Sequence, residues 1–304
     1  MCGLARVRRF RLHRRKAVVC AIAAGLAAGC SGPKPITVGS KNSTEQVILG
    51  EIAAQHLESR LKVPVIRRLN LNGTLLAHQS VALGQIDLYP EYTGTALTAV
   101  LKLPPENDPS VVMERVRQEY ERRFRLAWMP PLGFENGFAI AVLAERARTA
   151  HLQTLSDAAR YTPGWRIGVG YEFLERLDGY RTLMRTYRLP VVVPPESMEL
   201  GVLYQALEAG KVDLVAGSET DGLLTTASVT VLRDDLRAFP PYQAAFVVRA
   251  DALSVHPGMA ESLTELSGRF NESLMQKLNA EVDVQHRPVS AVARGFLRQA
   301  GLAQ

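Results

Sequence analysis

One stretch, residues 86–97, constrains the fold more than any other part of the sequence. Its apolar strand pattern is interrupted by Pro90, and a new apolar pattern begins at Ala96 and Leu97. Pro90 fixes its own φ angle, supplies no backbone N–H group and pushes the preceding residue toward extended geometry. The pattern therefore predicts a strand that ends at Pro90, then a loop and a helix. Open α/β sheets bind ligands where a strand leads into a helix in this way.

Two tyrosines, Tyr89 and Tyr92, lie in the predicted loop beside Thr93, Gly94 and Thr95. Aromatic rings offer π-faces to a cation, and the free N–H groups at a helix start favour an anion. The loop is therefore a candidate ligand site. A simpler interpretation is that both tyrosines cap the edge of a sheet, because tyrosine is common in strand-to-helix loops.

The composition is that of a globular protein with a basic leader. The 304 residues are enough for two lobes, and 47% hydrophobic with 22% charged residues is typical of globular chains. The formal net charge of +6 comes from residues 1–29, which hold seven basic residues and no acid. The remainder has 29 basic and 30 acidic residues, so the sequence argues against a nucleic-acid partner.

The leader is typical of an export signal, because a basic run precedes a short apolar run and a small-residue cleavage site. The apolar run is too short for an ordinary membrane span. Residues 26–30 resemble a bacterial lipobox, although Ala27 stands where leucine is usual. We expect a lipoprotein signal peptide over residues 1–29, lipidation of Cys30, and a short tether over residues 30–35.

The cysteines and histidines argue against a metal site. All three cysteines lie at or before the predicted cleavage site, at positions 2, 20 and 30. The six histidines are scattered, with no two at the spacing of metal ligands. We therefore expect no metal, no cofactor and no disulfide bond in the mature chain.

The rest of the chain alternates between strand and helix patterns. Predicted strands cover residues 36–39, 63–69, 165–169, 191–193, 212–215, 229–232 and 245–248. Predicted helices cover residues 40–57, 74–83, 109–124, 179–187, 199–209, 258–279 and 288–301. This rhythm predicts parallel sheets. Ser43 or Asn42 can cap the first helix, and Gln46, three residues after Ser43, predicts a capping box there.

Four motifs resemble those of the substrate-binding proteins of ABC importers for glycine betaine, choline and related osmoprotectants. They are Lys41–Gln46, Tyr89–Thr95, Glu172–Gly179 and Phe239–Tyr242. The resemblance covers nearly all of residues 36–302 and implies an α/β fold of the type II periplasmic-binding-protein kind. We expect residues 36–137 and 243–304 to form lobe 1 and residues 138–242 to form lobe 2. Two crossover segments would then hinge a ligand cleft.

The resemblance implies a monomeric receptor that captures a small quaternary-ammonium or zwitterionic solute and delivers it to an ABC permease and its ATPase. The ligand contacts that it implies are Lys41, Tyr92, Thr95, Phe138, Arg176, Ser218 and Tyr242. Two of these residues have a simpler interpretation. Lys41 could be a solvated surface charge, and Phe138 could be a buried strand residue without a ligand role.

These residue types suit a zwitterion. A quaternary ammonium group cannot donate hydrogen bonds, so aromatic rings hold it by cation–π attraction, whereas Lys41, Thr95 and the fork of Arg176 suit a carboxylate. Ser218 departs from the family, because osmoprotectant binders often have a cage tyrosine at this position. Losing one desolvated cation–π contact costs about 2 kcal/mol, or roughly thirtyfold in affinity. The ligand is therefore bound more weakly or is a different small solute.

Two other functions are compatible with the same scaffold. An enzyme would need a catalytic constellation, and the sequence has no nucleophile-elbow, zincin or P-loop motif. Acid pairs such as Glu172 and Glu175 are routine on helix surfaces. A ligand sensor needs only a separate signalling partner, whereas a receptor fused to a permease would need membrane-spanning segments that this sequence does not show. The sequence favours a binding protein.

The lipid anchor can be tested with the full chain expressed in a bacterial host. Cys30→Ser removes the thiol that would carry the lipid, so the protein should leave the membrane fraction on immunoblots. Cys20→Ser, a substitution inside the predicted leader, is the matched control and should leave the membrane association unchanged. Equal membrane association of the wild type and Cys30→Ser would contradict the anchor.

Overall fold

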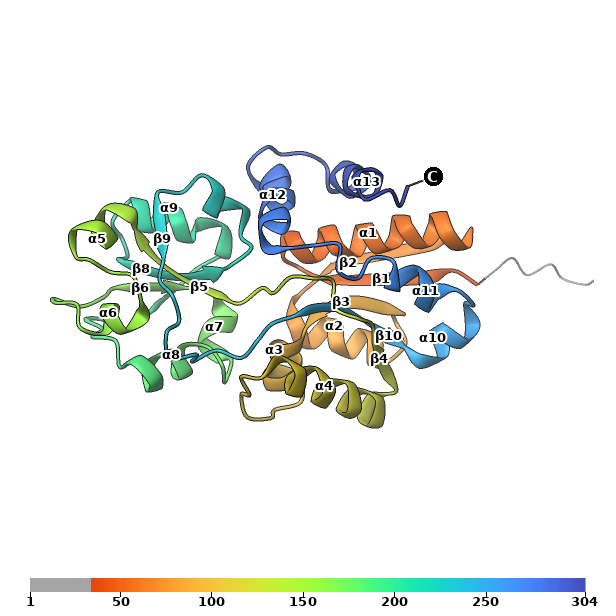
Figure 1. Ribbon diagram of the computed structural model, residues 1–304, viewed down its shortest axis with the longest axis horizontal. Helices are drawn as coiled ribbons and strands as arrows, with labels where there is room; N and C mark the ends of the chain where they lie inside the picture. The colour runs from red at the N-terminus through yellow and green to blue at the C-terminus, as the bar shows by residue number, and fades with distance from the viewer. Residues whose placement is uncertain (1–33, 304) are drawn as a thin grey trace, which may run out of the picture. The chain divides into compact units, whose positions relative to one another are not determined.

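The computed structural model describes residues 34–303, so the predicted signal peptide and Cys30 lie outside the described residues. The described chain forms two five-stranded sheets, each covered by helices (Figure 1). The prediction of an α/β protein built on two sheets is confirmed. We call the elements around the sheet that contains β1 the first lobe and those around the other sheet the second lobe. The residue boundaries given above for the lobes remain a prediction.

The strands are short and are numbered in chain order. They are β1 (Ile36–Lys41), β2 (Val65–Leu71), β3 (Leu88–Tyr92), β4 (Leu126–Trp128), β5 (Phe138–Leu143), β6 (Ile167–Val169), β7 (Glu196–Ser197), β8 (Leu214–Ser218), β9 (Val229–Val231) and β10 (Ala244–Arg249).

The helices vary from single turns to five turns, and short turns of other helical types are marked η. They are α1 (Thr44–Leu61), α2 (Gly73–Ala82), α3 (Thr93–Thr95), η1 (Ala96–Val100), α4 (Pro109–Phe124), α5 (Ala144–Thr149), α6 (Leu155–Ala159), α7 (Tyr171–Glu175), α8 (Tyr180–Tyr187), η2 (Leu200–Val202), α9 (Leu203–Glu208), η3 (Gly222–Thr225), α10 (Ala250–Val255), α11 (Met259–Thr264), α12 (Glu272–Asp283) and α13 (Val289–Gln299).

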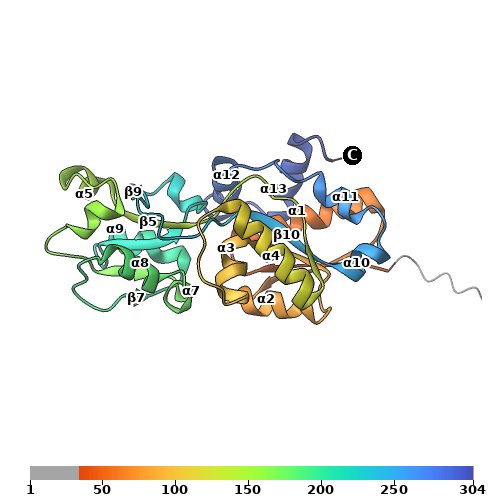
Figure 2. The same cartoon turned by 60° about the horizontal axis from the view of Figure 1, so that its bottom comes forward.

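The first sheet has the order β2-β1-β3-β10-β4. Helices α1, α12 and α13 cover one face, and α2, α3 and α4 cover the other (Figure 2). Strand β1 is parallel to β2 and β3, as predicted, but β10 is antiparallel to β3 and β4. The prediction of parallel sheets is wrong at β10 and also at β5 (Phe138–Leu143) of the second sheet. The chain returns to the first sheet at the end of β3, where the N–H of Thr93 donates to the carbonyl of Gln243, so β10 begins at that end and runs back along β3.

The second sheet has the order β7-β6-β8-β5-β9, with β6 parallel to its neighbours and β5 antiparallel to its own. Helix α9 packs on one face, and α6, α7 and α8 pack on the other. The chain enters this lobe through residues 129–137 and leaves it through residues 232–243. These two crossover segments pair through an antiparallel bridge between Glu135 and Gln243.

The predicted strand break at Pro90 is wrong, because β3 continues through Pro90 to Tyr92. The register partner of Pro90 in β10 is Phe246. The carbonyl of Phe246 accepts a hydrogen bond from the backbone N–H of Met129 on the opposite side of β10. The ladder between β3 and β10 therefore does not require a donor at Pro90. Among the described residues β3 pairs with β1 only at Leu88, so a proline can stand in this central strand.

Two further elements differ from their predictions. The helix predicted over residues 258–279 is two helices, because Gly268 adopts a φ of +67° and the side chain of Asn271 starts α12 by accepting from the backbone of Leu274. The strand predicted over residues 191–193 forms only an isolated bridge between Val191 and Trp165, which lies just before β6. Prolines directly after this run lack the N–H groups that would extend the pairing.

The helix starts were predicted with mixed success. Helix α4 has the predicted bounds of residues 109–124, and the side chain of Asp108 accepts hydrogen bonds from two backbone N–H groups of its first turn. The predicted capping box at α1 is wrong. Ser43 precedes the helix without a side-chain capping bond, and Oε1 of Gln46 accepts instead from the backbone N–H of Lys41 at 3.5 Å.

The end of β3 is held against the second crossover segment. The backbone N–H of Thr93 donates to the carbonyl of Gln243, and Oγ1 of Thr93 donates to the carbonyl of Pro241, both at 3.1 Å. Gly94 permits this approach, because a Cβ atom there would lie 2.7 Å from the Pro241 oxygen and 2.7 Å from the ring of Tyr242. The missing side chain of Gly94 therefore allows the crossover to contact β3.

We predict that Gly94→Ala lowers the free energy of unfolding by about 1–3 kcal/mol, since backbone or ring atoms must move to admit the methyl group. Urea denaturation of the purified protein measures this change. Gly295→Ala is the matched control, because a Cβ at this position of α13 meets no atom within 4 Å. The control should be neutral or slightly stabilising. Equal stability of Gly94→Ala and the wild type would contradict the tight contact.

Candidate functional site

Lys41 and Tyr92 are the last residues of the neighbouring strands β1 and β3. Lys41 is only 7% exposed, and its Nζ forms an ion pair with Glu91, which is fully buried. The same Nζ lies 4.9 Å from the centroid of the Tyr92 ring. The interpretation of Lys41 as a solvated surface charge is therefore wrong, and its charge is compensated within the first lobe.

The two tyrosines of β3 belong to different cores. Tyr89 packs with α2 and α4, and its hydroxyl donates to Glu91 at 3.2 Å. Tyr92 packs on the α1 side of the sheet, and its hydroxyl donates to Glu45. Residues three apart in a strand face opposite sides, which explains the separation. Because β3 is the third of five strands, the interpretation that both tyrosines cap a sheet edge is wrong.

Arg176 follows α7 and forms a two-pronged ion pair with Asp178. Its Nε and Nη2 donate to the two carboxylate oxygens at 2.9 and 2.6 Å, and its Nη1 donates to Oγ1 of Thr95 at 3.1 Å. Burial disfavours the charged guanidinium, but the Asp178 carboxylate outweighs this effect and raises the pKa of Arg176. Burial also opposes the charge on Asp178, yet the arginine lowers its pKa. Both groups are therefore charged.

A ring cluster surrounds this guanidinium. Phe138 makes edge-to-face contacts with Phe173, Phe239 and Tyr242, with ring centroids 4.7, 5.3 and 5.5 Å away. The Arg176 guanidinium carbon lies 5.1 Å from the centroid of the Phe138 ring and 5.6 Å from that of Tyr242. The Tyr242 hydroxyl donates to Asp178 at 2.6 Å. Phe138 is therefore part of an aromatic cluster that holds a cation.

Ser218 ends β8 and is the register partner of Phe138. Its hydroxyl donates to Oδ1 of Asn136 at 2.5 Å and lies 3.2 Å from the hydroxyl of Thr220. Asn136 in turn donates through Nδ2 to Glu45 at 2.9 Å. A chain of hydrogen bonds therefore links the second lobe, through the first crossover segment, to α1.

The structure brings the sequence-predicted residues together in two adjoining groups. In the first group, Arg176 contacts Thr95, Phe138 and Tyr242, and the rings of Phe138 and Tyr242 also contact each other. Lys41 and Tyr92 form the second group. Ser218 is connected to this group through the hydrogen bonds of Asn136 and Glu45.

The sequence reasoning missed Glu45, Asn136, Asp178 and Asn279. Glu45 is 3% exposed, and burial raises the pKa of its carboxyl although the Thr220, Tyr92, Asn136 and Asn279 side chains oppose this rise by hydrogen bonding. The positions of three of them gave a usable signal, since Asp178 lies inside the Glu172–Gly179 motif. Glu45 lies inside the Lys41–Gln46 motif, and Asn136 stands two residues before Phe138.

Asp221 lies in the turn after β8 and starts η3 by accepting a hydrogen bond from the backbone N–H of Leu223 at 2.9 Å. Burial raises the pKa of Asp221 to about 6, and the carboxyls of Asp283 and Glu45 contribute to the rise. The Asp221 carboxyl therefore faces carboxyl groups of α1 and α12.

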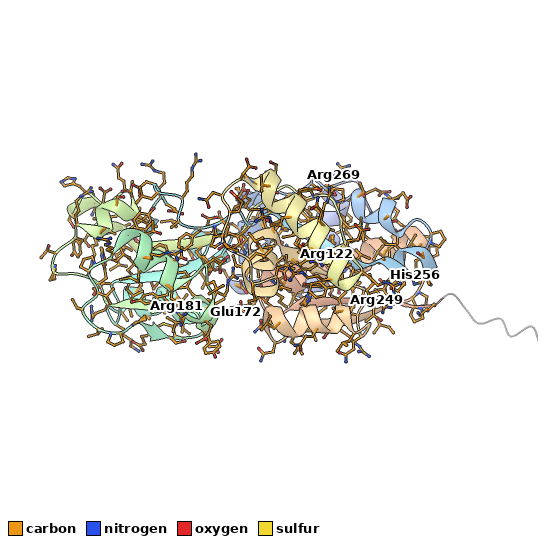
Figure 3. All side chains as sticks on the ribbon, turned by 90° about the horizontal axis from the view of Figure 1, so that it is seen from below. Arg122, Glu172, Arg181, Arg249, His256 and Arg269 are labelled. Carbon is orange, nitrogen blue, oxygen red and sulfur yellow. The ribbon has the colours of Figure 1, made fainter. Side chains whose placement is uncertain are left out.

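Glu172, one of the two acids of the Glu172 and Glu175 pair, has a structural role. Oε1 of Glu172, which is labelled in Figure 3, accepts from the backbone N–H of Thr74 at 3.2 Å. Thr74 is the second residue of α2, so the Glu172 carboxylate lies at a helix start, where the helix dipole favours negative charge. The same hydrogen bond connects the two lobes.

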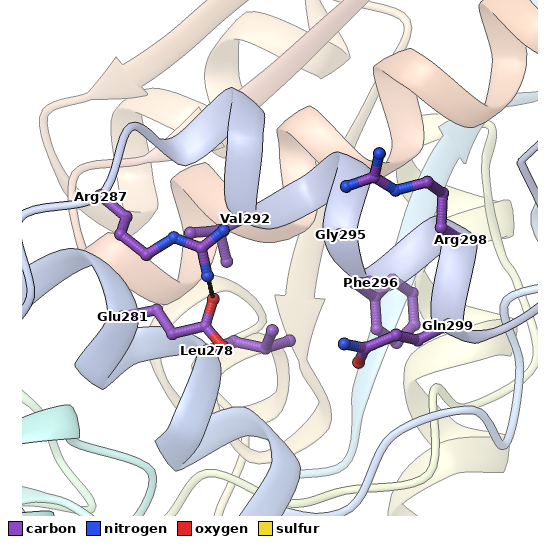
Figure 4. Close-up of a pocket in the computed structure, with 8 residues that line it drawn as sticks. All are labelled: Leu278, Glu281, Arg287, Val292, Gly295, Phe296, Arg298 and Gln299. Atoms are coloured by element: carbon purple, nitrogen blue, oxygen red, sulfur yellow. Dashed lines mark hydrogen bonds and ion pairs between the residues drawn. The ribbon is translucent and has the colours of Figure 1, made fainter.

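A pocket of about 180 Å³ lies between α12 and α13 and contains none of the predicted ligand contacts (Figure 4). Its apolar walls include Leu278, Val292 and Phe296, and Arg287 pairs with Glu281 at its side. Within residues 34–303, no three acidic, histidine or cysteine side chains are grouped to hold a metal ion. No helix among these residues has the length and apolar character needed to cross a membrane.

Two sheets joined by two crossovers, with buried charges and rings at the strand ends, define a type II periplasmic binding protein. Residues 34–299 match the OpuAC family, described as the substrate binding domain of ABC-type glycine betaine transport systems. The chain belongs to this family of solute-binding proteins. Its membership confirms the prediction of a binding protein for ABC import rather than an enzyme.

Relatives and a solved structure agree with this assignment. The ergothioneine transport permease/ergothioneine binding protein EgtU of Helicobacter pylori is 34% identical over 270 residues, which are 88% of this chain and 48% of that protein. This chain therefore spans about half the length of that relative. The glycine-betaine-binding protein of Pseudomonas aeruginosa is 34% identical over 293 residues, covering 92% and 93% of the two chains.

The crystal structure of a glycine betaine/carnitine/choline ABC transporter component has a TM-score of 0.77 and 29% sequence identity to this protein. The match covers 88% of this chain and 99% of that one. Apo YehZ from Escherichia coli has a TM-score of 0.67 at 28% identity. The predicted type II periplasmic-binding-protein fold is confirmed.

The pKa of Asp221 predicts how stability depends on pH. The folded chain holds the Asp221 proton to about pH 6, whereas the ordinary value is 3.8, so this group's contribution to stability is lost as pH rises from about 4 to about 6. Asp221→Asn should remove that decline, which amounts to about 3 kcal/mol in the free energy of unfolding. Urea denaturation in steps of about one pH unit between about pH 4 and about pH 7 measures the free energy of unfolding of both proteins. Parallel stability curves for both proteins would contradict the shift.

Proposed function

We propose that this protein binds a small quaternary-ammonium solute beside Tyr92 and Phe138 and delivers it to an ABC permease and its ATPase. The observation that carries the proposal is the guanidinium group of Arg176 against the rings of Phe138 and Tyr242, at 5.1 and 5.6 Å. The faces of these rings attract cations, and a quaternary ammonium group is a cation that such faces recognise. The name of the Pseudomonas relative supports the same class of ligand.

The proposed ligand site consists of the seven residues expected from the sequence, which are Lys41, Tyr92, Thr95, Phe138, Arg176, Ser218 and Tyr242. The three rings would supply apolar surface and cation–π attraction to the quaternary ammonium group. The two hydroxyls would contact polar parts of the solute. Because both cations already have carboxylate partners, either would bind a ligand carboxylate only with its remaining N–H groups.

We also propose that the crossover segments, residues 129–137 and 232–243, are the hinge between the predicted lobes. The segments contact each other at Glu135 and Gln243, so they can bend as a pair. Polar contacts between the lobes, such as Arg176 with Thr95, are single hydrogen bonds that solvent can replace.

The proposed place of action is outside the cytoplasm, with the protein tethered to a membrane through lipidated Cys30. The basic leader and its lipobox-like end support this proposal. We also propose that the protein acts as a monomer.

A second candidate ligand is a betaine with a bulkier group, such as ergothioneine. The Helicobacter relative is named for that solute. Ser218 occupies less space than the cage tyrosine that osmoprotectant binders often have at this position. Its hydroxyl can form a hydrogen bond with a polar substituent of the ligand. A sensor that signals to a separate partner would use the same site, so the ligand test below applies to it as well.

Calorimetric titration with choline, glycine betaine, carnitine and ergothioneine tests the proposal. We expect at least one quaternary amine to bind the wild type, and Tyr92→Ala to weaken that ligand by about thirtyfold through loss of ring burial and cation–π attraction. Ser218→Tyr should strengthen choline or betaine about tenfold if a ring is missing there.

Tyr171→Ala is the matched control, because that tyrosine is 70% exposed at the start of α7. The control should leave affinity unchanged. Loss of ergothioneine binding in Ser218→Tyr, with choline and betaine undetectable in both proteins, would favour the bulkier ligand. No binding of any of the four amines to the wild type would contradict the proposed function.

A further inference from the structure

Helix α12 packs on the first lobe and lies at the boundary with the second lobe (Figure 1). Its apolar side chains Met275 and Leu278 are buried in the core that α1 shares with the first sheet. At the end of the helix, Oδ1 of Asp283 accepts a hydrogen bond from the Thr44 hydroxyl at 2.6 Å. These contacts fix α12 to α1, so the helix moves with the first lobe.

The other side of α12 packs against the turn of the second lobe that follows β8 and contains η3. Gly222 permits this approach, because a Cβ atom there would lie 2.4 Å from a backbone nitrogen of α12. The Gln276 side chain donates to the carbonyl of Glu219 at 2.7 Å. The buried Asn279 side chain donates to the carbonyl of Thr220, also at 2.7 Å. We call this contact of α12 with the turn the pivot contact.

The pivot contact adjoins the first crossover segment. The backbone N–H of Gly137 donates to Oε2 of Glu219 at 3.0 Å, and the N–H of Glu219 donates to the carbonyl of Gly137 at 3.1 Å. At the start of α12, Oε1 of Glu272 accepts from the backbone N–H of Glu135 at 3.3 Å. Helix, turn and crossover are therefore held together, and a rotation of the lobes about this line would change their contacts least.

The lobes also meet where α2 faces α7. Figure 2 shows α12 above the level of β5 and β10, the strands that follow the two crossover segments, and α2 and α7 below it. Here Oε1 of Glu172 accepts from the backbone N–H of Thr74 at 3.2 Å. Nearby, the Arg176 guanidinium donates to the hydroxyl of Thr95 at 3.1 Å. We call this pair of hydrogen bonds between the lobes the gate contact.

Apolar side chains contribute little to the gate contact. Leu75 of α2 is 53% exposed, and Tyr171 of α7 is 70% exposed. Leu76 and Leu177, which follow the two hydrogen-bonded segments, are exposed as well. Side chains of this size that remain in water are not buried against the other lobe, so little apolar burial is lost when the gate contact separates.

We propose that the lobes move about the pivot contact, which stays closed, and that the cleft opens at the gate contact. The two hydrogen bonds of the gate can be exchanged for hydrogen bonds to water. Separation of the pivot would instead remove close backbone packing around Gly222 and uncover Asn279. A solute would therefore enter and leave between α2 and α7. The path of the solute rests on the proposed function, whereas the direction of movement does not.

Two cross-links test the direction of movement in the full chain with its three cysteines replaced by serine. Leu75→Cys with Glu172→Cys places one thiol on each side of the gate contact. Glu219→Cys with Gln276→Cys does the same at the pivot contact. A flexible bis-maleimide joins each pair, and each double variant without the reagent is the matched control for its two substitutions.

Small-angle scattering without any solute is the first measurement. The gate cross-link should lower the radius of gyration relative to its unlinked control, because it holds together the side that opens. The pivot cross-link should leave the radius of gyration unchanged, because it joins segments that stay in contact. An unchanged radius in the gate-linked protein, or an equal decrease in the pivot-linked protein, would overturn the inference.

Solute release is the second measurement. The probe is radiolabelled choline, glycine betaine, carnitine or ergothioneine, whichever binds the wild type most tightly, chased with unlabelled solute. Closing the gate cross-link over the bound solute should slow its release by about tenfold or more, and the pivot cross-link should change the rate by no more than about twofold. Release from the gate-linked protein at the rate of its control would overturn the inference.

The two measurements separate this inference from the proposed function. A wild type that binds none of the four amines would contradict the proposed function, and the scattering comparison would still decide the direction of movement. Binding of an amine together with equal effects of the two cross-links would overturn the inference and leave the proposed function standing.

Discussion

The two buried ion pairs, Lys41 with Glu91 and Arg176 with Asp178, are the constraint on which the candidate site depends. A charged group removed from water needs a partner within contact distance, because desolvation costs several kcal/mol per ion. Each cation here finds its partner in its own lobe, within two residues along the chain or on a neighbouring strand. The site is therefore assembled from compensated pairs, and its rings contact cations of the protein itself.

Tyr242 connects these pairs to the crossover geometry. Its hydroxyl binds Asp178 of the second lobe, its ring contacts the Arg176 guanidinium, and Gly94 of the first lobe leaves room for it. The two prolines before it stiffen the segment, so the ring is presented at low entropic cost. A movement between the lobes must therefore rearrange the hydrogen bond of Tyr242 or that of Arg176 to Thr95. Some atoms of the proposed ligand site therefore also make contacts at the proposed hinge.

The sequence predicted the fold better than it predicted the site. Apolar periodicity located α4 to the residue, because burial on one face at helical spacing is a local property. It failed at Pro90, since the strand's tolerance of proline depends on where Phe246, far along the chain, directs its carbonyl. The motifs identified Lys41 and Arg176 but not their partners Glu91 and Asp178. Charge compensation depends on three-dimensional neighbours, which residue spacing alone does not encode.

The serine at position 218 illustrates how a hydrogen-bond network can take the place of an aromatic face. A desolvated cation–π contact contributes about 2 kcal/mol, whereas a hydrogen bond contributes about 1 kcal/mol. Asn136 bridges Ser218 to Glu45 through hydrogen bonds of 2.5 and 2.9 Å. Ser218 therefore joins β8 to α1 through Asn136, and a larger ring at this position would have to displace that link between the two lobes.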